Sequence, residues 1–518
     1  MIKLTDFSKK IFTIILIISG ILCALLQSSL DIPLLAFVSF APVMYALQKY
    51  AGKGKREFVL SFIEFFLPYY FTQTIFLVEA SRSAPFSHFL AGILLFIATL
   101  ALTLLLSVIT FIPVYTIRWL KRNPLTDMIF LSALITMGDF LSQHIPLLSF
   151  PWSSPALCLT SMTKMIQSAN IFGSLFVSFV LLLCNGLMAL LFSSPKKIRT
   201  GIILVSVAGI NFSYGCFYEN FARNNLPENT INVMCVQDNA EGDEKAKIKP
   251  LDASKSYLKI MYENISPETN LVILPETPIL EGYYADRDEF RLLNDFAKDQ
   301  DCVIISGCFL REGKSYNSQY AIRPDGSISN FYCKQVLVPF GERNPIALLT
   351  GEHTLSPGTD KEKLKPLECG NYKIGCAICI ESIYPEISKS HAKNGAEILC
   401  VSTNDSWFGN SGGRVQHFRH CILRSVENSK YLVRAGNCGI SAVISPTGKI
   451  IAKNASKDKG VVKAVISNVS RETFYTKTGE LYVVFPTLLM VIALARRFMS
   501  YRGRLSEISL RKKSKRKS

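Results

Sequence analysis

The sequence predicts an α+β membrane protein in which eight transmembrane helices carry one α/β domain outside the bilayer. Three observations predict this. Apolar runs fill the first half of the chain, basic residues gather in alternate loops, and near residue 218 the long apolar runs give way to short β-rich runs between polar helical stretches. Hydrophobic residues make up 49% of the 518 residues, and the mean hydropathy is +0.25. That balance suits a mixture of membrane helices and a water-exposed domain.

The apolar runs fall near residues 11–29, 33–48, 58–78, 87–112, 127–142, 172–194, 200–217 and 480–496. A helix that spans a bilayer needs about 20 apolar residues. The second and fifth runs are short, and the fifth contains Asp139. Lys9 and Lys10 before the first run would also fit a cleaved signal peptide, but that run is long and more spans follow it closely.

Basic residues predict the orientation of these spans. Lys and Arg gather in the N-terminus, in the second, fourth and sixth loops and in the tail, while the other short loops hold only Arg82 and Lys164. Loops rich in Lys and Arg stay in the cytoplasm, so the large segment 218–479 is expected outside. The net charge of +17 therefore follows from topology, and we expect no nucleic-acid binding. Anionic lipid at the basic tail remains an alternative.

The segment 218–479 alternates β-rich runs with polar helical stretches, which is typical of buried strands with covering helices. The clearest β-rich runs are INVMCVQ (231–237), LVILPE (271–276), KIGCAICIE (373–381) and AEILCVST (396–403). Fourteen cysteines in so long a chain imply no disulfide framework, and Cys235 and Cys400 are expected to be buried thiols. The expected domains are a transmembrane domain (1–219), the external domain (220–472), a last transmembrane helix (473–497) and a basic cytoplasmic tail (498–518).

Three residues in this domain combine into a candidate site. Glu276 ends LVILPE, Lys334 lies in FYCKQVLVPFGE, and Cys379 ends KIGCAIC. A thiol reacts as its thiolate, whose ordinary pKa is about 8.5, so it needs a base. A carboxylate at the end of an apolar strand is expected to have a raised pKa suited to that task. A lysine would stabilise the oxyanion that forms on an attacked carbonyl.

In this order and these contexts, the three residues resemble the catalytic triad of the nitrilase superfamily. Five further runs are similar to its membrane-embedded branch, the apolipoprotein N-acyltransferases: FPW (150–152), LVPFGERNP (337–345), STNDSWFG (402–409), QHF (416–418) and LRSVENSKYLVRAGNCGISAVISPTGKI (423–450). The resemblance implies a multi-pass protein of a bacterial inner membrane with a periplasmic, nitrilase-like α-β-β-α sandwich. Ile380 departs from the family, which often has an aromatic residue there.

The resemblance also implies the last step of lipoprotein maturation. An acyl chain passes from a phospholipid to Cys379 as a thioester, and then to the α-amino group of an S-diacylglyceryl-cysteine apolipoprotein. Glu276 acts as base and then acid, and Lys334 stabilises both tetrahedral states. The expected partners are the phospholipid donor, the apolipoprotein and the membrane. We expect a monomer with no cofactor and no metal.

Six further residues are candidates for binding substrate or supporting the triad: Trp152, Glu342, Glu381, Asn404, Trp407 and Phe408. The two glutamates would position the triad or serve only as structural carboxylates. The three residues after the strand 396–403 would wall an acyl pocket or pack a loop. The tryptophan of the external loop would line a path for lipid or lie at the membrane interface.

An acyl-enzyme needs protection from water. We therefore expect loops 281–290 and 340–365 to open toward the membrane, with Tyr283, Tyr284 and Phe290 giving the first loop an apolar face. Two other functions remain open. One is a membrane-tethered amidase of the nitrilase type, with water as the second acceptor. The other is a transporter or binding protein with an inactive domain, although Glu64 and Asp139 are the only obvious acidic groups within the spans.

Overall fold

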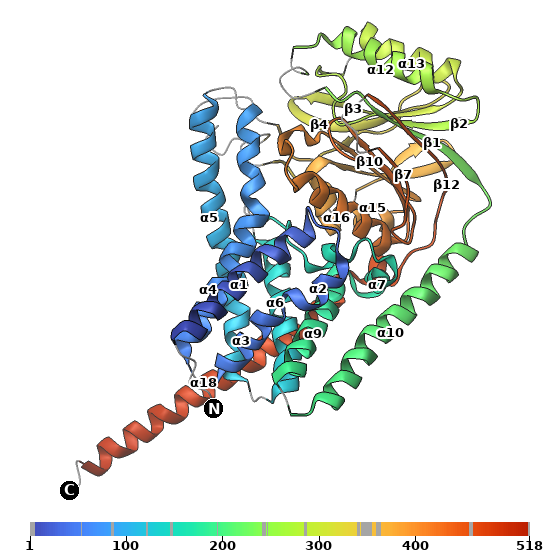
Figure 1. Cartoon of the computed structure of the whole chain (residues 1–518). Helices are drawn as coiled ribbons and strands as arrows, with labels where there is room; N and C mark the ends of the chain where they lie inside the picture. The colour runs from blue at the N-terminus through green and yellow to red at the C-terminus, as the bar shows by residue number, and fades with distance from the viewer. Residues whose placement is uncertain are drawn as a thin grey trace.

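The computed structural model describes residues 6–52, 54–83, 87–120, 123–145, 149–193, 195–240, 245, 247–283, 287–338, 342, 355–358, 364–454 and 459–515. These residues form a helical membrane domain and a sandwich of two β-sheets (Figure 1). The predicted fold class is confirmed.

The helices of the membrane domain come from both ends of the chain. They are α1 (Asp6–Gln27), α2 (Pro33–Ser39), α3 (Ala41–Ala51), α4 (Lys55–Thr74), α5 (His88–Tyr115), α6 (Pro124–His144), α7 (Thr163–Ile166), α8 (Ala169–Phe172), α9 (Ser174–Ser193), α10 (Lys197–Asn224), α17 (Phe474–Thr478) and α18 (Val484–Lys515). Short 3-10 helices lie between them: η1 (Ile75–Ser83), η2 (Thr116–Trp119), η3 (Pro155–Leu159) and η7 (Leu481–Val483).

Seven helices in the described part of the chain are long and apolar enough to cross a membrane, which makes this a multi-pass membrane protein. They coincide with seven of the eight predicted runs. The remaining run, 58–78, falls on α4 and η1. α4 has 20 residues, but Glu57, Glu64 and several polar side chains reduce its apolar character, so it is not among the seven. Its aromatic residues nevertheless pack in the core of the helix bundle.

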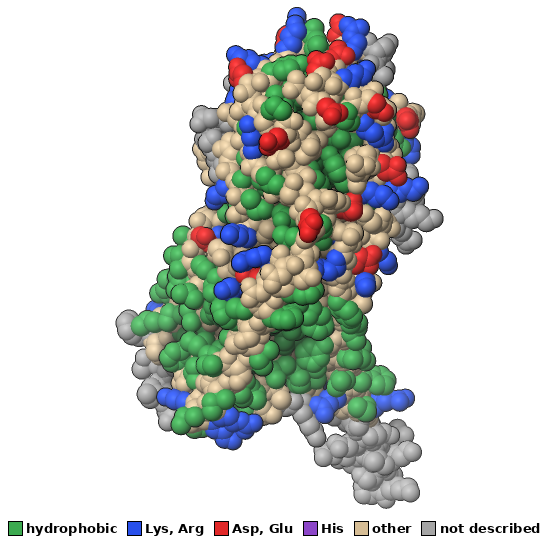
Figure 2. All heavy atoms as spheres, turned by 90° about the vertical axis from the view of Figure 1, so that its right-hand side faces the viewer, with side chains coloured by type: hydrophobic (Ala, Val, Ile, Leu, Met, Phe, Trp, Pro, Cys, Tyr) green, Lys and Arg blue, Asp and Glu red, His purple; other side chains and the backbone are tan. Residues whose placement is uncertain are grey.

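The surface of the membrane domain differs from that of the sandwich. On the face that Figure 2 shows, a broad hydrophobic band crosses the lower half of the molecule, and mixed acidic and basic side chains cover the upper half. Lys and Arg side chains gather at the lower edge of the band. Figure 1 places both chain ends on the side of the membrane domain away from the sandwich. This arrangement agrees with the charge pattern of the loops.

The sandwich contains two sheets of six strands, in the orders β12-β1-β2-β3-β4-β5 and β11-β10-β9-β8-β7-β6. The strands are β1 (Thr230–Gln237), β2 (Thr269–Ile273), β3 (Val303–Glu312), β4 (Lys314–Ile322), β5 (Tyr332–Cys333), β6 (Leu367–Cys369), β7 (Tyr372–Ile378), β8 (Ile398–Thr403), β9 (Tyr431–Gly436), β10 (Ser441–Ile444), β11 (Ile450–Asn454) and β12 (Gly460–Ser467). In each sheet the central strands run parallel.

Successive side chains of a strand point to opposite faces of its sheet, so each sheet packs against the other sheet on one face and against helices on the other. This gives four layers: helices, sheet, sheet, helices. In β1, Val233 and Cys235 belong to the core between the sheets, whereas Met234 and Val236 pack with the outer helices α12 (Pro250–Asn264) and α13 (Asp288–Asp299). The other sheet is covered by α15 (Pro385–Lys393) and α16 (Gly413–Asn428). These two helices face the membrane domain (Figure 1). The expected buried thiols Cys235 and Cys400 are confirmed.

α16 joins the sandwich to the membrane domain through buried hydrogen bonds. At its start, the Gln416 side-chain amide donates to Gln73 Oε1 at 2.6 Å and to the Trp152 carbonyl at 3.1 Å. At its end, the Ser174 backbone N–H donates to Glu427 Oε1 at 3.0 Å. Both contacts bury polar atoms with partners from the other domain, so the two domains form one packed unit.

The expected membrane-facing loop at 281–290 is wrong for the residues that the structure describes. Phe290 is 1% exposed and belongs to the core under α13. The Tyr283 ring packs edge-on against Phe290 at a centroid distance of 5.0 Å. Helix α13 lies in the layer farthest from the membrane domain (Figure 1). The apolar spacing of α13 directs Phe290 onto the sheet. Tyr284 and most of loop 340–365 lie outside the described residues.

Two glycines of α10 provide a matched test of its packing. A Cβ at Gly215 would lie 1.8 Å from the Lys164 carbonyl oxygen, whereas a Cβ at Gly209 meets nothing within 4 Å. We expect Gly215→Ala to destabilise the protein by about 1–3 kcal/mol, because α10 must move away from α7. Gly209→Ala should be neutral or slightly stabilising. Thermal unfolding of the detergent-solubilised protein measures both, and equal melting temperatures would contradict the packing described here.

Candidate active site

The three predicted residues meet at one edge of the sandwich. Glu276 lies three residues beyond β2, Lys334 follows β5, and Cys379 follows β7. β2 and β5 run in the same direction, so both residues lie at carboxyl ends of strands in their sheet. Lys334 Nζ is 3.0 Å from Glu276 Oε1, and the Cys379 thiol interacts electrostatically with both residues.

Glu276 is buried but surrounded by donors. Its Oε1 accepts from Lys334 and from Asn317 Nδ2 at 2.9 Å, and its Oε2 accepts from the Asn404 backbone N–H at 3.0 Å. Burial alone would raise the pKa of Glu276. The charges of Lys334 and Lys245 and the hydrogen bonds from Lys334 and Asn317 outweigh burial and lower that pKa. The raised pKa predicted from the apolar strand is therefore wrong, and the carboxylate is ionised at neutral pH.

Lys334 is held between two carboxylates. It is 1% exposed, and its Nζ lies 2.8 Å from Glu342 Oε1 as well as 3.0 Å from Glu276. Glu342 in turn accepts from Asn317 Nδ2 and from the Val338 backbone N–H, each at 2.9 Å. Burial opposes the charge of Lys334, but the two carboxylates raise its pKa well above the ordinary value. Lys334 is thus held as a cation, and its ammonium group is fixed between Glu276 and Glu342.

Cys379 occupies a strained turn. Its φ is +53°, a left-handed conformation that costs a non-glycine residue roughly 1–2 kcal/mol. The turn begins the 3-10 helix η5 (Cys379–Ile383), and the Cys379 carbonyl accepts a hydrogen bond from Ser382 Oγ at 3.0 Å. Burial, followed by the negative charge of Glu276, raises the pKa of the thiol despite the nearby Lys334. The candidate nucleophile is therefore a neutral thiol in this structure, and it would need a base to react.

A second buried cluster supports this turn from below. His417 Nε2 lies 3.0 Å from the Cys379 carbonyl oxygen, and His417 Nδ1 lies 2.9 Å from Asp405 Oδ1. Arg434 Nη2 donates to Asp405 Oδ2 at 2.6 Å. Burial would raise the pKa of Asp405, but Arg434 and His417 lower it. Sequence reasoning assigned no role to Asp405, His417 or Asn317; the first two lie in the runs NDSWFG and QHF.

Glu381 connects the two sheets at the site. It is fully buried, and its Oε1 accepts from the backbone N–H groups of Gln335 and Val336, beside Lys334. Its Oε2 accepts from the Ile378 N–H at 2.7 Å, beside Cys379, and from the Tyr332 hydroxyl at 2.8 Å. The position of Lys334 relative to Cys379 therefore depends on this carboxylate.

The aromatic candidates separate into two environments. Phe408 and Trp152 are buried with ring centroids 5.5 Å apart, and Phe76 of η1 packs against both, at 5.2 and 4.5 Å. Trp152 is thus buried between the domains and is not exposed at a membrane interface. Trp407 is 44% exposed. Asn404 contributes its backbone N–H to Glu276, and its side chain accepts from Asn437 Nδ2 at 3.2 Å.

The described residues contain no group of three or more His, Cys, Asp or Glu side chains arranged to hold a metal ion. His417 and His420, which form an HxxH pair, are both engaged in hydrogen bonds. His417 contacts Asp405 and the Cys379 carbonyl, and His420 Nε2 lies 3.0 Å from the Trp152 carbonyl. On α16, His417 therefore contacts the Cys379 turn, and His420 contacts the domain interface at Trp152.

Glu381→Gln tests the link between the sheets. Both carboxylate oxygens face N–H donors, so either orientation of the amide places an NH₂ group against a donor. We expect a loss of about 1–3 kcal/mol of stability and about a 100-fold slower acylation of Cys379, because Lys334 and Cys379 move apart. Thermal unfolding and single-turnover labelling of Cys379 measure the two effects.

Tyr332→Phe is the matched control, since it removes one of the four donors and leaves the three backbone contacts. It should cost about 1 kcal/mol with little change in rate. Equal rates for wild type and Glu381→Gln would show that this carboxylate does not position the site.

Known families match both halves of the chain. A family described as "Carbon-nitrogen hydrolase" matches residues 248–475, and one described as "Apolipoprotein N-acyltransferase N-terminal domain" matches residues 19–187. The first range covers most of the sandwich with all three triad candidates. The second covers the helices from α1 to α9.

Individual relatives agree with these matches. The chain is 25% identical to the apolipoprotein N-acyltransferase of Geobacter metallireducens over 501 residues, covering 90% of this chain and 91% of that protein. It is 30% identical to that of Pseudomonas syringae pv. tomato over 404 residues, covering 73% and 75%.

Among solved structures, it is similar to Saccharomyces cerevisiae Nit3, a nitrilase-superfamily member (20% identity, TM-score 0.37, 46% of this chain and 90% of that one). Another is the carbon-nitrogen hydrolase from Helicobacter pylori G27 (19% identity, TM-score 0.36, 53% and 98%). The resemblance predicted from the sequence is confirmed, and the chain belongs to the apolipoprotein N-acyltransferase family.

Proposed function

We propose that this protein is the acyltransferase that moves an acyl chain from a membrane phospholipid to the α-amino group of S-diacylglyceryl-cysteine apolipoproteins, through a thioester on Cys379. The observation that carries the proposal is a buried Glu276–Lys334 ion pair beside the Cys379 thiol, in a sandwich packed onto membrane-spanning helices. Family membership supports lipoprotein N-acylation.

In the first half-reaction, Cys379 attacks the ester carbonyl of the phospholipid. Glu276 takes the thiol proton as the S–C bond forms, and Lys334 stabilises the oxyanion together with a backbone N–H beside Cys379. When the C–O bond breaks, Glu276 returns the proton to the departing lysophospholipid. The product is the thioester.

Glu342 explains how Glu276 can accept a proton while it is paired with a lysine. When Glu276 becomes neutral, Lys334 would lose its partner in a buried site, which is costly. Glu342 lies 2.8 Å from the same ammonium group and keeps it paired. The second carboxylate therefore lowers the cost of protonating Glu276 and keeps Lys334 directed at the oxyanion.

In the second half-reaction, the α-amino group of the apolipoprotein attacks the thioester. Glu276 now takes a proton from the amine, the C–S bond breaks, and the thiolate of Cys379 recovers a proton from Glu276. The amide product is the N-acylated lipoprotein. Ping-pong kinetics follow, and this chemistry requires no cofactor or metal.

The membrane domain explains why both substrates can be lipids. Extracting an acyl chain into water costs about 0.8 kcal/mol per CH₂, and a site beside spanning helices avoids most of that cost. We propose that residues 1–219 and 473–497 hold the enzyme in the bacterial inner membrane and that residues 220–472 face the periplasm. The loop charges and the position of both chain ends support this orientation. We propose that the enzyme works as a monomer.

Labelled phosphatidylethanolamine tests the thioester. We expect wild-type protein without acceptor to retain one labelled acyl chain, removed by hydroxylamine, and Cys379→Ala to retain none. Cys376→Ala is the matched control, since that buried thiol lies three residues away on β7 outside the site. Release of free fatty acid without labelled protein would indicate a hydrolase with water as acceptor.

The pH dependence tests the charge state of Glu276. Its folded pKa is lowered, so the ionised base is present above that pKa and is lost only as the pH falls through it. We expect the single-turnover acylation rate of Glu381→Gln to remain flat from about pH 7 to about pH 5, because an ordinary glutamate already titrates near 4.3. This variant is used because burial raises the pKa of Glu381 to about 7, within the range tested. Circular dichroism at each pH controls for unfolding. A decline centred above about pH 6 would contradict the lowered pKa.

A further inference from the structure

The membrane domain contains an open surface pocket, outside the sandwich that carries the candidate active site. A shallow cavity, open to the surface and lined by residues between 195 and 203, lies where α9 ends and α10 begins. Its lining combines three basic residues, Lys196, Lys197 and Arg199, with three isoleucines, Ile198, Ile202 and Ile203. The proposed function uses the charges of the basic residues only to orient the protein in the membrane.

The packing of α10 explains why the cavity exists. This helix is the least buried of the seven candidate spans, and it lies along the outside of the membrane domain (Figure 1). At its middle it contacts α7 closely, where Asn211 Nδ2 donates to the Met165 carbonyl at 2.8 Å. At its start, Ile203 is partly buried against the bundle, but Ile202 is 63% exposed. Space therefore remains beside the first turns of α10.

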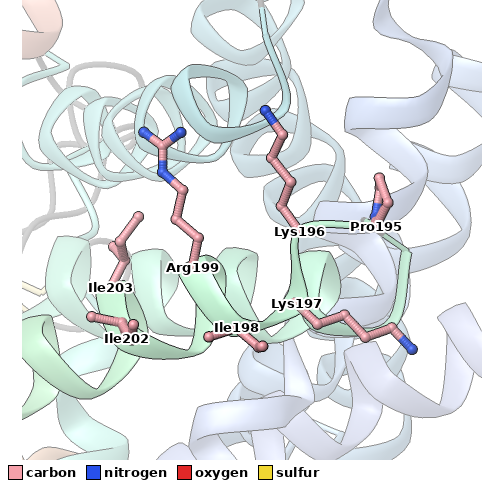
Figure 3. Close-up of a pocket in the computed structure, with 7 residues that line it drawn as sticks. All are labelled: Pro195, Lys196, Lys197, Ile198, Arg199, Ile202 and Ile203. Carbon is pink, nitrogen blue, oxygen red and sulfur yellow. The ribbon is translucent and has the colours of Figure 1, made fainter.

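The side chains around this space are cationic at one end and apolar at the other. Figure 3 shows Lys196 and Arg199 pointing to the same side of the chain, whereas Lys197 points away. Arg199 and Ile203 are four residues apart on α10, so they lie on one face of the helix. A pair of cations thus adjoins an apolar surface that continues along a membrane-spanning helix.

We propose that this cavity binds an anionic phospholipid, with its phosphate between Lys196 and Arg199 and its acyl chains along Ile202 and Ile203. Charge complementarity selects the headgroup, because a guanidinium and an ammonium together match a phosphodiester with net negative charge. The exposed isoleucines select a lipid over a soluble anion, because acyl chains cover apolar surface that water would otherwise contact. This lipid is distinct from the acyl donor at Cys379.

Native mass spectrometry of the full-length enzyme in a neutral detergent tests the proposal. The probes are dialkyl-ether phosphatidylglycerol and dialkyl-ether phosphatidylethanolamine of equal chain length, which lack the ester that Cys379 would attack. We expect the wild type to retain phosphatidylglycerol in preference. Lys196→Gln with Arg199→Gln should weaken that binding by about tenfold or more and leave the phosphatidylethanolamine signal unchanged.

Lys55→Gln with Arg56→Gln is the matched control, since it removes two exposed charges at the start of α4 and should leave binding intact. The single variant Arg199→Gln is measured in parallel, so that poor folding of the double variant leaves the test valid. Acyl transfer in phosphatidylethanolamine micelles should be the same for all variants.

Three results would overturn the proposal. One is undiminished phosphatidylglycerol binding in both Arg199 variants, and another is an equal loss in the α4 control. The third is displacement of the lipid by millimolar inorganic phosphate, which would indicate a site for soluble anions.

Discussion

The two sheets of the sandwich each supply part of the site, and one buried carboxylate holds those parts in place. Glu381 accepts hydrogen bonds from the backbone on both sides, next to Lys334 in one sheet and next to Cys379 in the other. Sheet packing alone is non-directional and would tolerate small sliding movements. Four directed hydrogen bonds to a single group do not, so the distance between the cation and the nucleophile is fixed before substrate arrives.

The electrostatics of the site follow from the same constraint. Because Lys334 is held against Glu276 and Glu342, its charge is stabilised in a buried position and it stabilises an ionised base. The thiol remains neutral because burial outweighs the lysine. Before substrate binds, the Cys379 sulfur therefore carries the proton and the glutamates carry the negative charge. In the proposed mechanism, the proton moves from sulfur to Glu276 only when an acyl carbonyl is in place. A neutral thiol is also less prone to oxidation than a thiolate.

Apolar runs and loop charges were sufficient to predict the helical membrane domain, and strand-like runs predicted an α/β domain, because these are local features. The two-sheet sandwich and the meeting of Glu276, Lys334 and Cys379 were implied only by the family resemblance. The sequence was not sufficient for properties set by distant partners. The pKa of Glu276 falls because of Lys334 and Asn317, which come from other strands. Phe290 was expected in a membrane-facing loop, but the apolar face of α13 buries it. Asp405 and His417 gain their importance only when β8 and α16 meet under Cys379.

α16 has a consequence for how the two domains can diverge. Gln416 contacts the membrane domain through Gln73 and Trp152, and the next residue, His417, supports the carbonyl of Cys379. A helix is a stiff rod over four turns, so a tilt that relieves strain at the membrane contact also displaces the nucleophile. The contact of α16 with the membrane domain and the position of the Cys379 thiol therefore depend on the same helix. A change in this helix that adapts the enzyme to a thicker or thinner membrane must preserve both, which restricts adaptation to other parts of the interface.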